Sequence, residues 1–165
     1  MTQLMDQEQR LDFLIRYLLN EKEEYQNMEI PADLPCKQRL LRSLMNVRPP
    51  VPASGDFLKV QDAYLQERLA ERGITRLEDL TPAQSGLYLW QGDITTLAVD
   101  AIVNAANGRM LGCFVPCHGC IDNAIHTYAG VQLRMECANI MAGQKKEEPT
   151  GKAKITGAYN LPCRY

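Results

Sequence analysis

The chain has 165 residues, of which 45% are hydrophobic and 23% are charged, and its formal net charge at pH 7 is -2. This composition is typical of a soluble globular protein and argues against a disordered or fibrous class. A chain with this small negative charge lacks the excess of basic residues that binding to duplex DNA or an anionic membrane requires. Local groups would therefore have to hold any anionic ligand.

The N-terminal sequence argues against export and membrane insertion. Acidic residues stand where a signal peptide needs a basic flank, and no stretch reaches about 18 apolar residues. We therefore expect a cytoplasmic protein. Six cysteines in a reducing compartment do not indicate a disulfide framework, and three of them, Cys113, Cys117 and Cys120, fall within one short segment. Such clustering indicates a metal-binding site.

The first 80 residues are predicted to be helical. In residues 6–26, leucines recur at the spacing of one helical face, namely Leu11, Leu14, Leu18 and Leu19. Prolines then interrupt the pattern, and residues 37–45 resume it. A third helix is predicted from about Asp56 to Arg72, with Gly73 well placed to end it. We interpret residues 1–80 as a helical N-terminal extension.

From residue 85 the pattern changes to strands that alternate with a helix. Residues 87–90 and 101–103 are predicted as short buried strands. Apolar residues at steps of three and four predict one helix over residues 122–141, and alternation predicts another strand over residues 153–159. This order favours an α/β layer architecture, in which helices cover a mixed or parallel sheet.

Polar side chains follow the first two predicted strands. Asp93, with Ile94 beside it, comes after the first strand, and Asn104 and Asn107 come after the second. Ligands bind at the strand ends of α/β sheets, so these side chains are candidate ligand contacts. The alternative is that Asp93 and Asn107 only cap turns.

The loop before the predicted helix contains candidate metal ligands. Thiolate and imidazole are the groups that zinc prefers. His118 and Cys120 can point the same way from an extended segment, and Cys113 can fold back around Pro116. If these three are the ligands, one position stays open, as in a catalytic zinc site. Cys117 either completes a closed structural site or faces away, and a metal-free group of buried thiols is a further alternative.

Asp122 lies at the expected start of that helix. A carboxylate there is favourable as a cap, and free backbone N–H groups at a helix start bind phosphate. Capping alone is the alternative role. His126 lies one turn further on and is more typical of a core histidine than of a ligand.

Three segments together resemble the motifs of the macrodomain family. They are Gly92–Thr95 (GDIT), Val99–Asn107 (VDAIVNAAN) and Ile121–Gly130 (IDNAIHTYAG). Where the common pattern has a few glycines, this chain has the insert Cys113–Cys120, which is similar to that of bacterial zinc-containing macrodomains often linked to a class M sirtuin. Residues 1–80 also resemble the N-terminal extension of those proteins.

The resemblance implies a three-layer α/β/α fold with the ligand in a cleft at the strand ends. Asp93 would bind the adenine amino group, and the loop before the helix would receive the pyrophosphate. Asn107 and Asp122 would hold the distal ribose and serve catalysis. The full set of implied ligand contacts is Asp93, Ile94, Asn104, Asn107, Ile121, Asp122 and Asn123.

The resemblance also implies a zinc ion (Zn2+) beside that ribose, held by Cys113, His118 and Cys120. The activity implied is hydrolysis of ADP-ribose from modified protein, in a pathway with a lipoyl-carrier protein and its sirtuin. Two alternatives stand beside it: a non-catalytic ADP-ribose-binding module with structural zinc, and an inactive fragment.

The implied organisation is a helical extension over residues 1–80 and the N-terminal part of a macrodomain, with its zinc-binding insert, over residues 85–165. Macrodomains continue with further strands, a second phosphate loop and a last helix. We therefore expect the chain to be truncated at its C-terminal side and its sheet to be incomplete.

Overall fold

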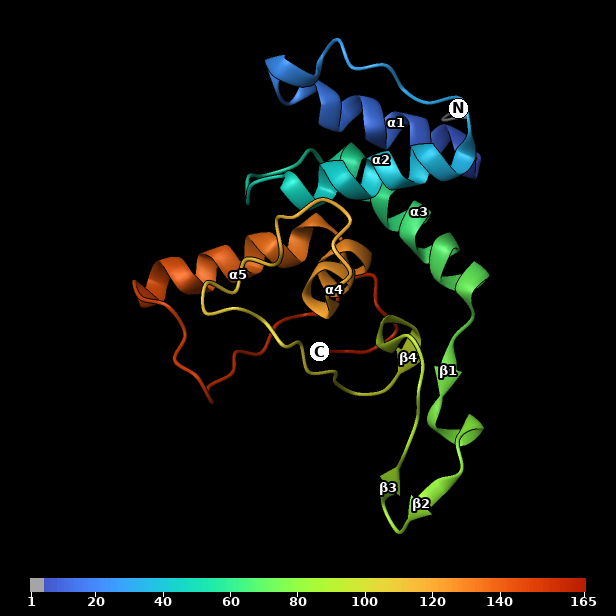
Figure 1. Cartoon of the computed structure of the whole chain (residues 1–165), viewed down its shortest axis with the longest axis vertical. Coiled ribbons are helices and arrows are strands. Elements are labelled where there is room, and N and C mark those ends of the chain that lie inside the picture. Colours follow the sequence, from blue (N-terminus) through green and yellow to red (C-terminus); the bar gives the residue numbers. More distant parts are fainter. Residues whose placement is uncertain (1–4) are drawn as a thin grey trace.

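The computed structural model describes residues 5–165, and helices make up most of its regular structure (Figure 1). The α-helices are α1 (Gln7–Asn20), α2 (Leu34–Val47), α3 (Gly55–Arg72), α4 (Ile121–Ala129) and α5 (Val131–Gln144). The strands are β1 (Thr75–Arg76), β2 (Pro82–Gln84), β3 (Leu87–Tyr88) and β4 (Leu97–Ala98). Within the described residues, no helix combines the length and apolar character that crossing a membrane requires.

Helices α1, α2 and α3 pack around one buried apolar core. Helix α1 begins after Asp6, whose carboxylate accepts from the Gln9 backbone N–H while the Gln9 side chain accepts from the Asp6 N–H. This reciprocal capping pairs two groups that a helix start otherwise leaves free. Val131, from α5, also belongs to this core. The leucines that predicted the first helix are all buried in it, namely Leu11, Leu14, Leu18 and Leu19, so that amphipathic pattern is confirmed.

The single helix predicted over residues 122–141 is wrong in one respect, because the structure has two helices there. Helices α4 and α5 are separated at Gly130, whose φ of +99° favours glycine. A Cβ atom at Gly130 would lie 2.6 Å from Nε2 of Gln61 in α3. The first N–H of α5, from Val131, donates to Oε1 of the same Gln61 at 3.0 Å. The chain therefore turns where α3 approaches most closely.

The sheet is smaller than predicted. Strand β1 pairs in parallel with β4, and β2 pairs antiparallel with β3. The strands predicted over 101–103 and 153–159 are wrong, since neither segment forms a strand in the described chain. Ile102 donates to the carbonyl of Tyr165 at 3.0 Å, but no longer ladder forms, and Ile155 is 71% exposed. A strand needs a hydrogen-bonded neighbour along its length, and these segments lack one within residues 5–165.

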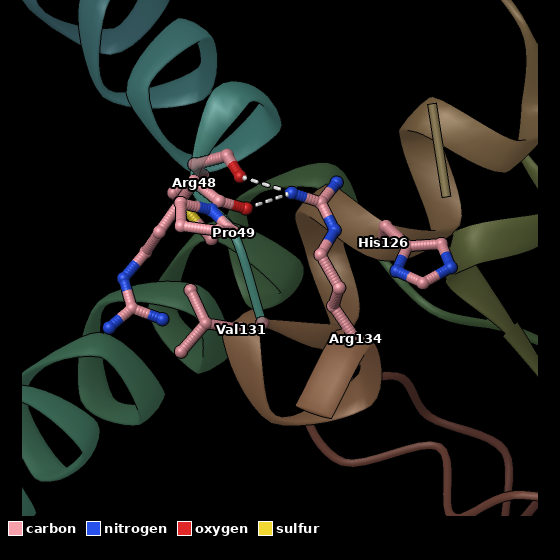
Figure 2. Close-up of a pocket in the computed structure, with 7 residues that line it drawn as sticks. Arg48, Pro49, His126, Val131 and Arg134 are labelled. Carbon is pink, nitrogen blue, oxygen red and sulfur yellow. Dashed lines mark hydrogen bonds between the residues drawn. The ribbon is translucent and has the colours of Figure 1, made fainter. Parts of the chain in front are cut away.

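A buried arginine joins the first group of helices, α1 to α3, to the second group, α4 and α5. Nη1 of Arg134, in α5, donates to the carbonyls of Met45 (3.2 Å), Asn46 (2.8 Å) and Arg48 (2.5 Å) at the end of α2. Figure 2 shows the bonds to Met45 and Arg48. Its guanidinium carbon lies 4.2 Å from the centre of the Phe114 ring. A cation at a helix C-terminus stabilises the unpaired carbonyls there. Helix α2 therefore sits directly against the segment that carries the candidate site.

Candidate functional site

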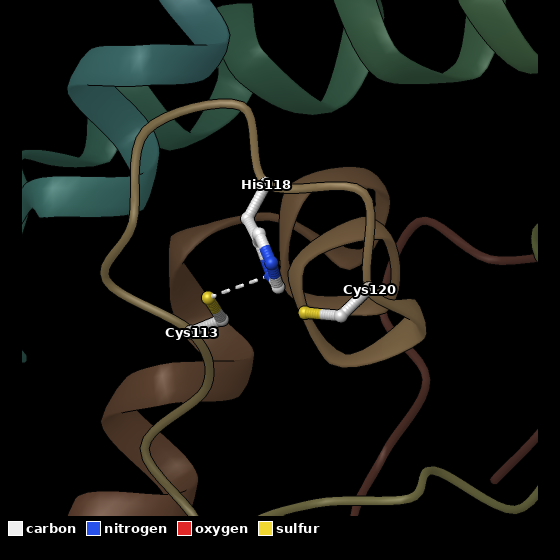
Figure 3. Close-up of side chains that lie close together, drawn as sticks. All are labelled: Cys113, His118 and Cys120. Carbon is white, nitrogen blue, oxygen red and sulfur yellow. Dashed lines mark hydrogen bonds between the residues drawn. The ribbon is translucent and has the colours of Figure 1, made fainter.

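The predicted metal ligands lie close together in the loop before α4. The ligand atoms of Cys113, His118 and Cys120 are all within 4.8 Å of one another, and Cys113 Sγ lies 3.6 Å from His118 Nδ1 (Figure 3). The loop leaves Cys113, runs toward α2 and returns at His118, so the three side chains meet beneath its turn (Figure 3). Two thiolates and one imidazole are a donor set that suits zinc, and the separations fit one ion.

Cys117 is not part of this group. Its φ is +52°, a left-handed value that non-glycine residues adopt rarely. This turn between Pro116 and His118 directs the thiol toward α2. Cys117 Sγ lies 3.2 Å from Oγ of Ser43 and 3.5 Å from the carbonyl of Arg39. Of the two roles considered for Cys117, the geometry matches the one in which it faces away.

Cys120 is also the N-cap of α4, and its Sγ accepts from the Asn123 backbone N–H at 3.4 Å. Asp122 therefore does not cap this helix. The thiol that would bind a metal also begins the helix. The loop Cys113–Cys120, here called the metal loop after its candidate ligands, and the start of α4 are therefore one structural unit.

Asp122 is buried at 5% exposure in the first turn of α4. Nδ2 of Asn104 donates to its Oδ1 at 2.8 Å, and Nδ2 of Asn107 approaches its Oδ2 at 3.5 Å. Burial raises the pKa of the Asp122 carboxyl, while the Asn104 hydrogen bond and the charge of Arg134 oppose that rise. The structure thus brings three of the predicted site residues into contact.

His126 lies one turn after Asp122, with Nε2 3.6 Å from Oδ1 of Asp122. Burial, together with the charge of Arg134, lowers the pKa of His126 to about 4. The imidazole is therefore neutral at pH 7, and the contact is not a charged pair. Its Nδ1 has no hydrogen-bond partner among the described residues. The expectation of a core histidine fits its burial.

Asp93 begins the short 3-10 helix Ile94–Thr96. Its Oδ1 accepts from the backbone N–H (2.9 Å) and Oγ1 (2.6 Å) of Thr95, and its Oδ2 accepts from Nη1 of Arg72 at 2.9 Å. Partial burial opposes ionisation, but these hydrogen bonds and the arginine charge outweigh it and lower the pKa of Asp93. Asp93 is therefore a carboxylate at neutral pH, and it caps a turn, which is the alternative role predicted for it.

The Asp93 group and the Asp122 group lie toward opposite ends of α4. The guanidinium of Arg72, which binds Asp93, stacks 3.7 Å from the ring centre of Tyr128 in the last turn of that helix. Tyr128 comes six residues after Asp122 along the helix, a rise of about 9 Å. Within the described residues, no hydrogen bond joins the two groups. A ligand that touched both would have to be elongated.

The other predicted contacts differ in how accessible they are. Asn104 and Asn107 line a cleft of about 850 Å³ between residues 101–110, residues 147–158 and helices α4 and α5. Ile121 is exposed. Asn123 is fully buried, with Oδ1 accepting from Arg42 and Nδ2 donating to the Val115 carbonyl, so its side chain already serves the protein.

Residues 103–165 match the Macro domain family. This segment is therefore similar to the macrodomain family. Its helices α4 and α5, the metal loop and the Asn104–Asp122 contact all fall inside the matched residues.

Two relatives align along nearly all of the chain, the helical N-terminal region included. One, from Treponema medium, is named "Protein-ADP-ribose hydrolase" and is 59% identical over 165 residues, which cover 98% of this chain and 63% of that protein. Another with the same name, from Staphylococcus aureus (strain MRSA252), is 47% identical over 166 residues, covering 100% of this chain and 62% of that protein. The chain therefore spans less than two thirds of these relatives.

Sequence reasoning missed the polar residues of α2 and α3 that hold the macrodomain segment. Arg42 donates to Asn123, Asn46 binds Thr127, and Arg72 binds Asp93. The only signal was the pair Arg42 and Asn46, four residues apart on one helix face. Such a pair is common on solvated faces, so spacing alone does not reveal a partner about 80 residues away.

Proposed function

We propose that this chain binds ADP-ribose and contributes the metal loop of a protein-ADP-ribose hydrolase. The observation that carries the proposal is the convergence of Cys113, His118 and Cys120 directly before the helix that holds Asp122. The names of the two relatives support the same activity.

The proposed ligand runs along α4. Asn107 and Asp122 hold the distal ribose and serve catalysis, while Asp93, with Ile94 beside it, receives the adenine amino group. A carboxylate that is ionised at neutral pH can accept from that amine. Asn104 fixes the Asp122 carboxylate, and the separation along α4 suits a ligand with two distant polar ends.

Ile121 and Asn123 are proposed to act through the backbone at the start of α4, where the pyrophosphate would bind. Unpaired N–H groups at a helix start favour an anion. Both polar atoms of the Asn123 side chain have protein partners, and its backbone N–H donates to Sγ of Cys120 at 3.4 Å. Asn123 would therefore contribute only if that N–H left the thiol for the anion.

Zinc is the proposed cofactor, with Cys113, His118 and Cys120 as its ligands. When bound, an ion with one open position supplies a Lewis acid beside the ribose. The chain itself supplies Asp122, a buried carboxylate that can orient a ribose hydroxyl or accept a proton. Because the Cys117 thiol contacts Ser43 of α2 instead of the other three side chains, the geometry supports a three-ligand site with an open position over a closed site of three cysteines and one histidine.

The proposed substrate is an ADP-ribosylated protein, and we extend it to a lipoyl-carrier protein modified by a class M sirtuin. This extension rests on the resemblance of the insert Cys113–Cys120 to the zinc-containing bacterial macrodomains. The proposal places the protein in the cytoplasm, because free thiols that bind metal need a reducing compartment.

The test is chelation with two separate readouts. ADP-ribose affinity is measured by calorimetry and release of ADP-ribose from a modified protein by chromatography, for this chain and for a full-length relative. We expect chelation to lower hydrolysis by at least about a hundredfold, as loss of one strong transition-state contact does, and to change affinity far less. Equal loss of both would contradict a catalytic metal, and unchanged hydrolysis would contradict zinc dependence.

A base-selectivity measurement tests the adenine role. Asp93→Ala is expected to weaken binding of ADP-ribose more than binding of an analogue without the exocyclic amine, because the lost contact reads that amine. Equal weakening for both ligands would remove Asp93 from base recognition.

A further inference from the structure

The metal loop lies against the polar face of α2, and one arginine bridges the two. Nη2 of Arg42 donates to the carbonyl of His118 at 3.1 Å and to Oδ1 of Asn123 at 2.7 Å, and Nε donates to the same Oδ1 at 3.2 Å. His118 is one of the clustered donors, and Asn123 lies in the first turn of α4. Arg42 therefore binds both sides of the turn that separates loop from helix.

The contacts continue on either side of this bridge. One turn along α2, Oδ1 of Asn46 accepts from the Cys117 N–H at 2.9 Å, and Nδ2 donates to Oγ1 of Thr127 at 2.9 Å. Nδ2 of Asn123 donates to the carbonyl of Val115 at 3.0 Å. Three successive parts of the loop backbone, at Val115, Cys117 and His118, are thus fixed by groups outside the loop.

We propose that Arg42 is a positioning residue that sets the metal loop in the conformation where Cys113, His118 and Cys120 converge. The loop has no regular secondary structure of its own, so it must be ordered by contacts made elsewhere. Helix α2 supplies the contacts at Cys117 and His118, and Asn123, which Arg42 holds, supplies the one at Val115. The inference rests on the proposed function only in treating the convergent side chains as metal ligands.

The shape of the guanidinium explains why an arginine stands here. Its Nε and Nη2 edges present two N–H groups to one amide oxygen, while a second N–H of Nη2 remains for the His118 carbonyl. A lysine ammonium reaches from a single point and cannot present the same planar fork. Arg42→Lys should therefore restore only part of what Arg42→Gln removes.

Arg39 is a matched control on the same helix. It is exposed, and its guanidinium makes no hydrogen bond or ion pair within residues 5–165; only its main-chain carbonyl is used, by Ser43 and Cys117. Arg39→Gln changes the same charge on the same element and leaves the loop contacts in place.

The experiment uses amide hydrogen exchange on the metal-free chain and zinc competition with a chromogenic chelator. For Arg42→Gln we expect faster exchange at residues 113–123 with unchanged exchange in α1 and α3, and a zinc dissociation constant raised by about tenfold or more, as for other groups that orient metal ligands. Arg42→Lys should fall between Arg42→Gln and the native chain, and Arg39→Gln should match the native chain.

Each outcome decides the inference. Unchanged exchange at 113–123 in Arg42→Gln overturns it, whatever the zinc affinity. Faster exchange with unchanged zinc affinity overturns the link between loop order and metal binding. If the native chain binds no zinc but exchange rises in Arg42→Gln, the proposed cofactor fails while the positioning role stands. If exchange rises equally across α1 and α3, Arg42 is merely structural and the inference is overturned.

Discussion

At the scale of single residues, the position of Cys117 decides how many side chains of the metal loop can bind one metal ion. Its thiol contacts Ser43 on α2 and lies outside the group of convergent donors. We expect Cys117→Ala to retain one zinc per chain, because no ligand is lost. Cys113→Ala is expected to lose the metal, since a three-ligand site loses its geometry when one ligand is removed. Elemental analysis of purified variants measures this, and metal loss from Cys117→Ala alone would show that the ligand set is wrong.

His126 makes a prediction about stability against pH. Its pKa is lowered from an ordinary value near 6.5 to about 4 in the folded chain, so the unfolded chain binds its proton first as the pH falls. The free energy of unfolding should therefore drop between pH 6.5 and 4, by about 1.4 kcal/mol per pH unit at most for one group. Asp122 opposes this, because its raised pKa favours proton uptake by the folded chain.

Urea unfolding of the metal-free chain at several pH values tests the prediction. His126→Gln keeps a polar side chain without this titration, so its unfolding free energy should be flatter over the same pH window. Parallel pH profiles for native and variant chains would exclude His126 as the titrating group.

At the scale of elements, the turn between α4 and α5 depends on Gly130. An alanine there meets both a positive φ and the Gln61 amide at 2.6 Å, so we expect Gly130→Ala to destabilise the chain by about 1–3 kcal/mol. Gly143→Ala is the control, because that glycine lies inside α5 with no atom within 4 Å of the added Cβ. The control should be neutral or slightly stabilising. Equal denaturation midpoints for the two variants would contradict this account.

The elements of this fold differ in how far the sequence alone could predict them. Helices α1 and α3 follow from local spacing of apolar residues, and the group of candidate metal ligands follows from three donors close together in the chain. The break at Gly130 was missed because apolar spacing continues through it, and only the approach of α3 reveals it. The strand at 101–103 was predicted from a short apolar run and the strand at 153–159 from alternation, but a strand exists only where a neighbour pairs with it. Arg42 was missed because its partners are distant in sequence.

At the scale of the whole molecule, Arg134 ties α5 to the end of α2. Arg134→Met would leave the carbonyls of Met45, Asn46 and Arg48 without their shared donor, at a cost of about 1–3 kcal/mol. Arg109→Met removes the same charge from an exposed side chain and should stay within about 0.5 kcal/mol of the native chain. Chemical denaturation followed by circular dichroism compares them, and equal midpoints would show that the Arg134 contacts add no net stability.

The placement of Val131 has a consequence for how the chain can be divided. This residue of α5 completes the core of α1, α2 and α3, whereas the β2–β3 turn at Gly86 lies on an exposed hairpin away from both helical groups (Figure 1). A protease that cuts in that turn should therefore yield two fragments that stay together. We expect the nicked protein to elute from gel filtration as one species in buffer and as two in urea, so the two halves would behave as complementing fragments rather than as separable units.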